Sequence, residues 1–174
     1  AEARLKIEYR KTEQAHICIG LKGIRTLHED RYPVALLNTI LGEGMSSRLF
    51  LEVRENRGLA YDVHSTVTHL KDCGSLIVYA GVEPKNAKLA INCILSELSN
   101  IKDGISEEEL NKSKEFLKGR LMLRMEDSRS VSSWYGSQEL LNQTSMTPEE
   151  MIEKVDLVTT DDIKRVAQYI IVSD

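Results

Sequence analysis

The chain has 174 residues, of which 41% are hydrophobic and 29% charged, a balance typical of one soluble globular domain that needs no disulfide or structural metal to bury a core. A net charge of −4 argues against nucleic acids and anionic membranes as partners, because both attract clustered Lys and Arg. The three cysteines, Cys18, Cys73 and Cys93, lie far apart, which indicates a reducing compartment and no disulfide framework. No apolar run reaches the ~18 residues of a membrane helix.

Alternating apolar residues predict strands near the start of the chain. Ala15, Ile17, Ile19 and Leu21 alternate with polar or small residues, which is the period of a strand. The same alternation at residues 5, 7 and 9 (Leu5, Ile7 and Tyr9) predicts an earlier strand.

A pair of helices is expected next. The first has Pro33 in its first turn, apolar residues between positions 35 and 41, and Gly42 at its end. Ser46 is expected to cap the second helix, and its buried candidates are Leu49, Phe50 and Val53.

The middle of the chain predicts a β-hairpin, from Tyr61 to Leu70 and from Ser75 to Val82, with a short connection that contains Gly74. Four helices are expected after it. They start near Pro84, at capping boxes that open with Ser106 and Thr147, and near Asp161.

The order of these elements predicts the fold class. Strands grouped as hairpins, without single crossover helices, indicate an α+β domain with a mainly antiparallel sheet covered by helices. No linker or low-complexity run divides residues 1–174, so we expect a single domain.

The histidines do not form a known zinc motif. His28-Glu29 begins like His-Glu-x-x-His, but Tyr32 stands where the second histidine would be, and the dipeptide Glu-His is absent. His64 and His69 are five apart on an expected strand and so point to opposite faces. His16 and Cys18 share a strand face, but two ligands at that spacing are a weak metal signal.

Serine and glycine residues near position 44 are better explained by structure than by chemistry. Ser46 and Ser47 lack the Gly-x-Ser-x-Gly context of a hydrolase nucleophile. Gly42 and Gly44 lack the Gly-Lys-Ser/Thr of a phosphate loop, so a turn between two helices accounts for them.

Arg54 and Tyr61 are the candidate site residues. Arg54 falls near a helix end, Gly58 permits a turn and Tyr61 starts a strand, so a guanidinium and a phenol should meet at one sheet edge, where both can donate to a carbonyl oxygen. The alternative is a surface ion pair of Arg54 with Glu55 or Asp62, with Tyr61 packed beside Val63.

The segment from Leu41 to Tyr61 closely resembles part of the insulinase-like (pitrilysin) zinc metallopeptidase family, and the resemblance extends through most of the chain. It is most similar to the second, C-terminal domain of the bacterial, processing-peptidase-like branch. The motifs that carry the resemblance are Gln14-Ala-His-Ile, Asp30-Arg-Tyr, Leu37-Asn-Thr-Ile-Leu-Gly, Met45-Ser-Ser-Arg-Leu-Phe, Val53-Arg-Glu-Asn-Arg-Gly-Leu-Ala-Tyr, Tyr79-Ala-Gly, Lys118-Gly-Arg-Leu and Val158-Thr.

In that family two similar halves enclose a peptide, and only one half carries the zinc motif His-x-x-Glu-His. The resemblance therefore implies that this chain is the non-catalytic half, with a metallopeptidase half-domain fold of the LuxS/processing-peptidase-like type and no metal or other cofactor of its own. Leu and Asn stand at the metal positions of the corresponding helix, between Leu36 and Gly42. Zinc is expected in a partner N-terminal domain of the same parent chain.

The resemblance also implies roles and partners. Arg54 would hold a backbone carbonyl of the peptide substrate, and Tyr61 would donate to the oxygen that becomes negative in the tetrahedral intermediate; Arg57, in the same loop, is expected to be a surface charge. A bacterial cytoplasmic setting and a homodimer of full-length chains follow by analogy. The alternative function is a catalytically silent peptide-binding or structural subunit of a processing-peptidase-like assembly.

Overall fold

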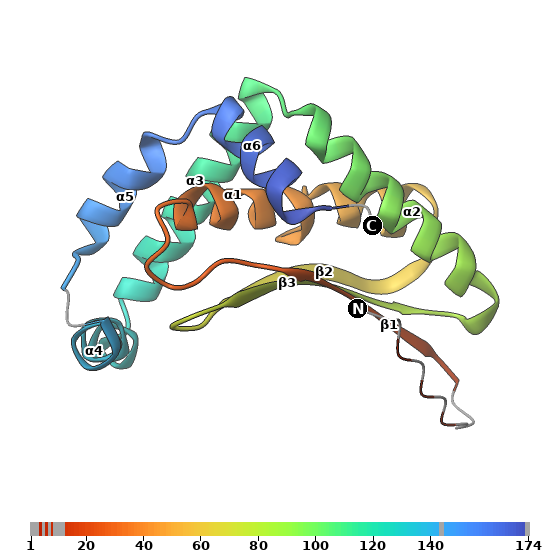
Figure 1. The fold of residues 1–174 in the computed structure, drawn as a ribbon, viewed down its shortest axis with the longest axis horizontal. Helices are drawn as coiled ribbons and strands as arrows, with labels where there is room; N and C mark the ends of the chain where they lie inside the picture. The colour runs from red at the N-terminus through yellow and green to blue at the C-terminus, as the bar shows by residue number, and fades with distance from the viewer. Residues whose placement is uncertain (1–3, 5, 7, 9–12, 143–144, 173–174) are drawn as a thin grey trace.

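A sheet covered by helices on one face is the main feature of the fold (Figure 1). The computed structural model describes residues 4, 6, 8, 13–142 and 145–172. In chain order the elements are β1 (Ala15–Lys22), α1 (Arg31–Gly42), η1 (Phe50–Asn56), β2 (Ala60–His69), β3 (Gly74–Val82), η2 (Pro84–Asn86), α2 (Ala87–Asn100), η3 (Ile101–Asp103), α3 (Glu107–Met125), α4 (Ser128–Ser137), η4 (Gln138–Asn142), α5 (Pro148–Asp156) and α6 (Thr160–Ile170).

The sheet confirms the α+β prediction. Within the described residues it has three strands in the order β1-β3-β2, and β3 pairs antiparallel with both neighbours. The predicted hairpin is present, because β2 and β3 are consecutive and His69 pairs with Gly74. Val78 and Val82 are fully buried on the helix side, whereas His16 and His64 are exposed on the other face.

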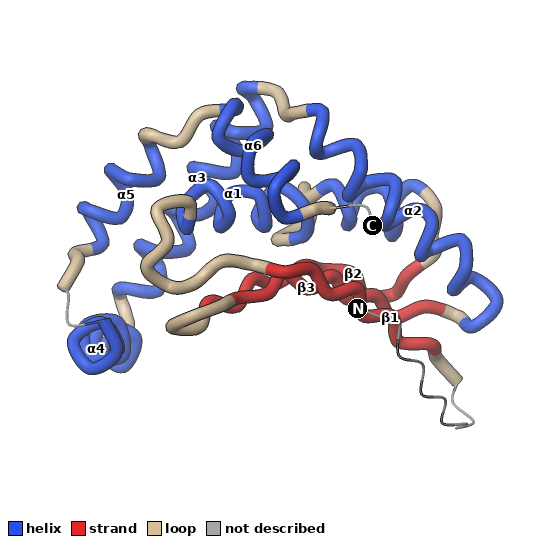
Figure 2. Tube along the Cα trace, in the orientation of Figure 1, coloured by secondary structure: helices blue, strands red, loops and turns tan. Residues whose placement is uncertain are grey.

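Helix α1 forms the centre of the core. Val34, Leu36, Leu37 and Leu41 have no solvent-exposed surface, and the helix contacts β2, α3, α5 and α6. Figure 2 shows the helical layer on one side of the sheet. Because its sides are enclosed by other elements, α1 is apolar around most of its circumference, as expected for a buried helix.

A close approach fixes the end of α1 against β2. A Cβ at Gly42 would overlap the backbone nitrogen and the hydroxyl of Ser65. The Ser65 hydroxyl oxygen lies 2.7 Å from Asn38 Oδ1 and 3.2 Å from the Asn38 carbonyl oxygen. Gly42 does end the helix, as predicted, but the residue with positive φ is Gly44, at 81°.

The helix starts confirm two predicted capping boxes and correct one cap. The boxes at Ser106 and Thr147 are both complete, and a third, at Thr159, opens α6. Ser46, expected to cap the second helix, is exposed and does not cap it. The residue before η1 is Leu49, and no side chain caps that helix. The buried Ser47 instead donates its hydroxyl to the Gly44 carbonyl at 2.8 Å and so closes the turn after α1.

Helix α4 was not predicted. Its three apolar side chains, Val131, Trp134 and Tyr135, are spaced as on one helix face, but five of its ten residues are serine, a poor helix former, and none is buried. It lies at one end of the molecule, away from the sheet (Figure 1), and the Trp134 indole donates to the Met146 carbonyl at 2.8 Å. The early strand predicted from Leu5, Ile7 and Tyr9 lies outside the described residues.

Two glycine substitutions should separate close packing from helix propensity. Gly42→Ala should lower the free energy of unfolding by about 1–3 kcal/mol, because the new methyl must displace Ser65. Gly119→Ala, in the middle of α3 with open space around it, should raise it by roughly 0.5–1 kcal/mol. Urea denaturation of both variants measures the difference, and an unchanged midpoint for Gly42→Ala would contradict the close approach.

Candidate functional site

Arg54 lies on η1, a helix of π type that leads directly into β2. The Gly58 amide donates to the Arg54 carbonyl at 3.0 Å and the Leu59 amide to the Val53 carbonyl at 2.9 Å. Gly58 has a φ of 60°, which confirms the predicted turn. Val53 is fully buried and anchors the helix, so the backbone of Arg54 is held at the corner where the sheet begins.

The Arg54 side chain faces solvent. Its guanidinium lies over the Phe50 ring, 4.9 Å from the centroid, and its Nε is 3.9 Å from the Glu55 carboxylate. Both charged side chains are about half exposed, at 45% and 55%, so water screens this ion pair and it contributes little to stability. The guanidinium therefore remains available to a ligand.

A β-bulge presents Tyr61. Ala60 pairs with Val82 and Asp62 with Gly81, so Tyr61 is the extra residue between two consecutive pairs. The insertion shifts the alternation of β2, and Ala60 and Val63 are both buried although they are three residues apart. Tyr61 and Asp62 are both exposed as a result, which is the re-aiming of a side chain that bulges produce.

The Tyr61 phenol is held at the rim of the sheet by a carboxylate. Its hydroxyl donates to Glu83 at 3.2 Å, and Glu83 also accepts from Lys85 Nζ at 2.7 Å. The hydrogen bond to Glu83, followed by the charge of Glu83, raises the pKa of the phenol. Tyr61 therefore stays protonated and keeps a proton to donate.

The alternative partners expected for Arg54 and Tyr61 are present only in part. Glu55 is the nearby acid of Arg54, as the surface-pair alternative expected. Asp62 instead lies 3.3 Å from His64. Tyr61 does not pack beside Val63, because Val63 is buried on the helix side while Tyr61 is 58% exposed. The side chains of Arg54 and Tyr61, both among the described residues, form no bond with each other.

Arg57, the second arginine of the loop, has a partner of its own. Its guanidinium pairs with Glu52 at 2.7 Å, and the Asn56 amide donates to the same carboxylate at 3.0 Å. The bond from Asn56, followed by the one from Arg57, lowers the pKa of Glu52. Arg57, which follows η1, is thus engaged by a close ion pair, whereas the acid nearest Arg54 lies 3.9 Å away.

The start of the η1 segment is tied to α3. Arg48 donates from Nε and Nη2 to the two Glu109 oxygens at 2.8 and 2.9 Å. Glu109 also completes the capping box of α3 with Ser106. The bond from Arg48 is the main reason that the pKa of Glu109 lies below its ordinary value. This fork joins a residue just before η1 to the first turn of α3.

The histidines have structural partners and do not gather around a metal position. His69 Nδ1 lies 2.8 Å from the Ile24 carbonyl, and His28 accepts from the Asp30 amide at 3.0 Å. His16 bonds to the Tyr79 hydroxyl at 2.7 Å, and the His64 ring lies 5.1 Å from the Tyr79 ring. Among the described residues no group of three or more His, Cys, Asp or Glu is placed to hold a metal ion.

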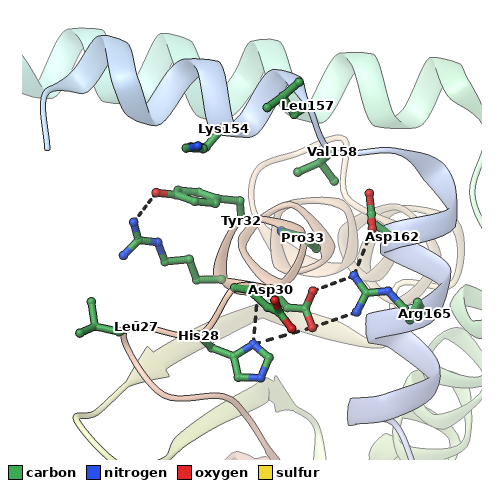
Figure 3. A pocket seen from close by; sticks show the side chains of 12 residues that line it. Leu27, His28, Asp30, Tyr32, Pro33, Lys154, Leu157, Val158, Asp162 and Arg165 are labelled. Carbon is green, nitrogen blue, oxygen red and sulfur yellow. Dashed lines mark hydrogen bonds and ion pairs between the residues drawn. The ribbon is translucent and has the colours of Figure 1, made fainter.

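A broad hollow of about 690 Å³ lies elsewhere, beside the start of α1 (Figure 3). Arg165 bridges it with two bonds to Asp30, at 2.9 and 2.7 Å, and one to Asp162 at 3.1 Å. These contacts satisfy the charges locally and join α6 to the residue before α1. We interpret the hollow as a structural junction, which gives Asp30 of the Asp30-Arg-Tyr motif a role in holding the helical layer together.

Among the described segments, no helix is both long enough and apolar enough to cross a bilayer.

The comparisons with known proteins identify a family. Residues 2–117 match the family model described as the peptidase M16 inactive domain. The chain is 37% identical over 98% of its length to an uncharacterized zinc protease of Streptomyces coelicolor and 39% identical over 95% to one of Bacillus subtilis. It spans only 38% and 41% of those two proteins.

The fold also agrees with solved structures. A crystal structure of a protein from Enterococcus faecalis superposes with a TM-score of 0.83 and 28% identity, over 92% of this chain and 38% of that one. The relatives are thus longer chains in which this fold is one domain.

The fork between Arg48 and Glu109 makes the stability of the chain depend on pH. Because folding lowers the pKa of Glu109 below its ordinary value of 4.5, the stabilisation is present above that pH and disappears as pH falls through the folded pKa. Glu109→Gln keeps the capping-box geometry and should lower the free energy of unfolding by about 0.5–1 kcal/mol at pH 7, with solvent screening included.

Denaturation at pH 7 and pH 3 tests this, with Glu108→Gln as the control. Glu108 is a first-turn acid of the same helix, and it has no ion pair with any residue that the structure describes. The Glu109→Gln difference should shrink at pH 3, and a difference that stays constant across this range would rule out the ionic explanation.

Proposed function

Because this chain belongs to the family of peptidase M16 inactive domains, we propose that it is the substrate-binding C-terminal half of a zinc-dependent metalloendopeptidase. The observation that supports this best is the corner between η1 and β2. There a bulge exposes Tyr61 seven residues after a solvent-facing Arg54. The peptide substrate would lie between this corner and a zinc-bearing N-terminal half of the same parent chain, in an enclosed chamber.

The chemistry of the two side chains suits that position. The Arg54 guanidinium is charged at any relevant pH and can donate two bonds to a backbone carbonyl of the substrate. The Tyr61 phenol is a donor with no charge of its own, and it can stabilise an oxygen that gains negative charge during hydrolysis. A preorganised donor of this kind contributes roughly a hundredfold or more to turnover.

The metal belongs to the proposed partner half. In this proposal the contribution of the present chain is to bind and orient the peptide. By analogy with the family, we expect the parent protein to act in the bacterial cytoplasm as a homodimer of full-length chains.

Arg54→Ala or Tyr61→Phe in the full-length parent should each lower kcat/KM for peptide cleavage by about a hundredfold, because each removes a donor to the substrate. Zinc content should not change. The matched control is Arg57→Ala, which removes a guanidinium from the same loop that is already engaged by Glu52 and should keep nearly full activity. Unchanged turnover in both Arg54→Ala and Tyr61→Phe would refute the proposed site.

Metal analysis tests whether zinc is bound by the N-terminal half and not by this chain. The full-length parent should contain about one zinc per chain, bound by an upstream His-x-x-Glu-His motif, while the 174-residue chain alone should contain none. One zinc per isolated chain would overturn the assignment. A full-length protein that lacks both zinc and the motif, yet binds peptides, would favour the catalytically silent subunit.

A further inference from the structure

We propose that Glu83 is the positioning residue of Tyr61, and that Lys85 keeps the charge of Glu83 from opposing catalysis. The inference rests on the proposed function and extends it to two residues that no sequence motif indicated. Glu83 follows β3 directly, and Lys85 lies in η2, two residues further along. Both are thus brought to the bulge by the pairing of β3 with β2.

Tyr61 needs such a partner because the bulge removes its packing. The inserted residue belongs to no strand pair, and its side chain is 58% exposed. A phenol in that setting can sample several rotamers, and each unproductive rotamer lowers the fraction of molecules ready to donate. The 3.2 Å hydrogen bond to Glu83 selects one of them.

The bond is compatible with later donation to a substrate. The hydroxyl proton can rotate about the C–O bond from Glu83 to a substrate oxygen while the ring keeps its place. Glu83 therefore serves as a substitute acceptor in the free protein. Because the same contact raises the pKa of the phenol, Tyr61 stays in the donor form at neutral and moderately alkaline pH.

Lys85 offsets the negative charge of Glu83. A bare carboxylate beside an oxygen that becomes negative would oppose the reaction. Lys85 Nζ lies 2.7 Å from the Glu83 oxygen that does not bond Tyr61, and this contact is the main reason that the pKa of Glu83 is lowered. The pair is close to neutral as a unit, so Glu83 can hold the phenol without repelling the reacting oxygen.

Peptide turnover by the full-length parent tests the positioning role. Glu83→Ala should lower kcat roughly tenfold with little change in KM, less than the loss expected when the donor itself is removed. Glu83→Gln, which keeps an acceptor, should retain most of the activity. Glu115→Gln is the control, because it breaks an exposed ion pair with Lys118 on α3, at 2.6 Å, and should not affect turnover.

The double variant Tyr61→Phe/Glu83→Ala distinguishes positioning from a general effect. If Glu83 acts through Tyr61, the double variant should be no slower than Tyr61→Phe alone. Two results would contradict the inference. Glu83→Ala could lower kcat by the same factor in the wild-type protein and in the Tyr61→Phe variant, or it could lower kcat in neither.

An NMR titration separates this inference from the proposed function. With ¹³Cζ-labelled tyrosine, and Tyr61→Phe to assign the signal, Glu83→Ala should move the Tyr61 titration to lower pH. An unmoved titration would overturn the contact itself. Activity that Tyr61→Phe leaves intact, together with a titration that does move, would refute the proposed function and leave Glu83 as the partner of Tyr61.

Discussion

The burial of α1 is the constraint on which the rest of the structure depends. The helix is enclosed by β2 on one side and by α3, α5 and α6 on the others, and its leucines at 36, 37 and 41 have no exposed surface. A helix enclosed in this way cannot rotate or slide without opening cavities, each of which costs about 2–5 kcal/mol when a leucine loses its contacts. The close approach of Gly42 to Ser65 and the Asn38 hydrogen bond then fix its register on the sheet.

The candidate site lies between two segments that pack in this core, the end of α1 and the start of β2. Between the end of α1 and the start of β2 the backbone departs twice from regular geometry, first in the π-type helix η1 and then in the bulge at Tyr61. Such departures are frequent near functional sites, because they change the direction of a side chain without disturbing the elements around it. Arg48 and Val53 hold the intervening helix to the core, so the irregular stretch is short and well supported.

The predictable parts of the fold are those encoded by neighbouring residues. The alternation from Ala15 to Leu21, the Gly-containing hairpin, the capping boxes at Ser106 and Thr147 and the turn at Gly58 each depend on a few consecutive positions, and all four are present. Contacts between distant segments were not predictable: Glu83 meets Tyr61 only through the register of β2 with β3, and His16 and His64 meet at Tyr79 only because β3 is the central strand. One feature of the sequence indicates the bulge. The apolar residues Ala60 and Val63 flank Tyr61 at a spacing of three, whereas regular strand alternation requires an even spacing.

The bulge has an evolutionary consequence. In a regular strand every position is constrained by the face to which it points, so a change of residue affects either the core or the cross-strand neighbour. The inserted residue at 61 lies between two consecutive pairs and projects toward solvent, and its hydroxyl bonds to Glu83, which lies just after β3 and is not part of the sheet. Its identity can therefore vary with the chemistry required at the corner while the sheet stays intact, so one scaffold could acquire or lose a reactive group there by single substitutions.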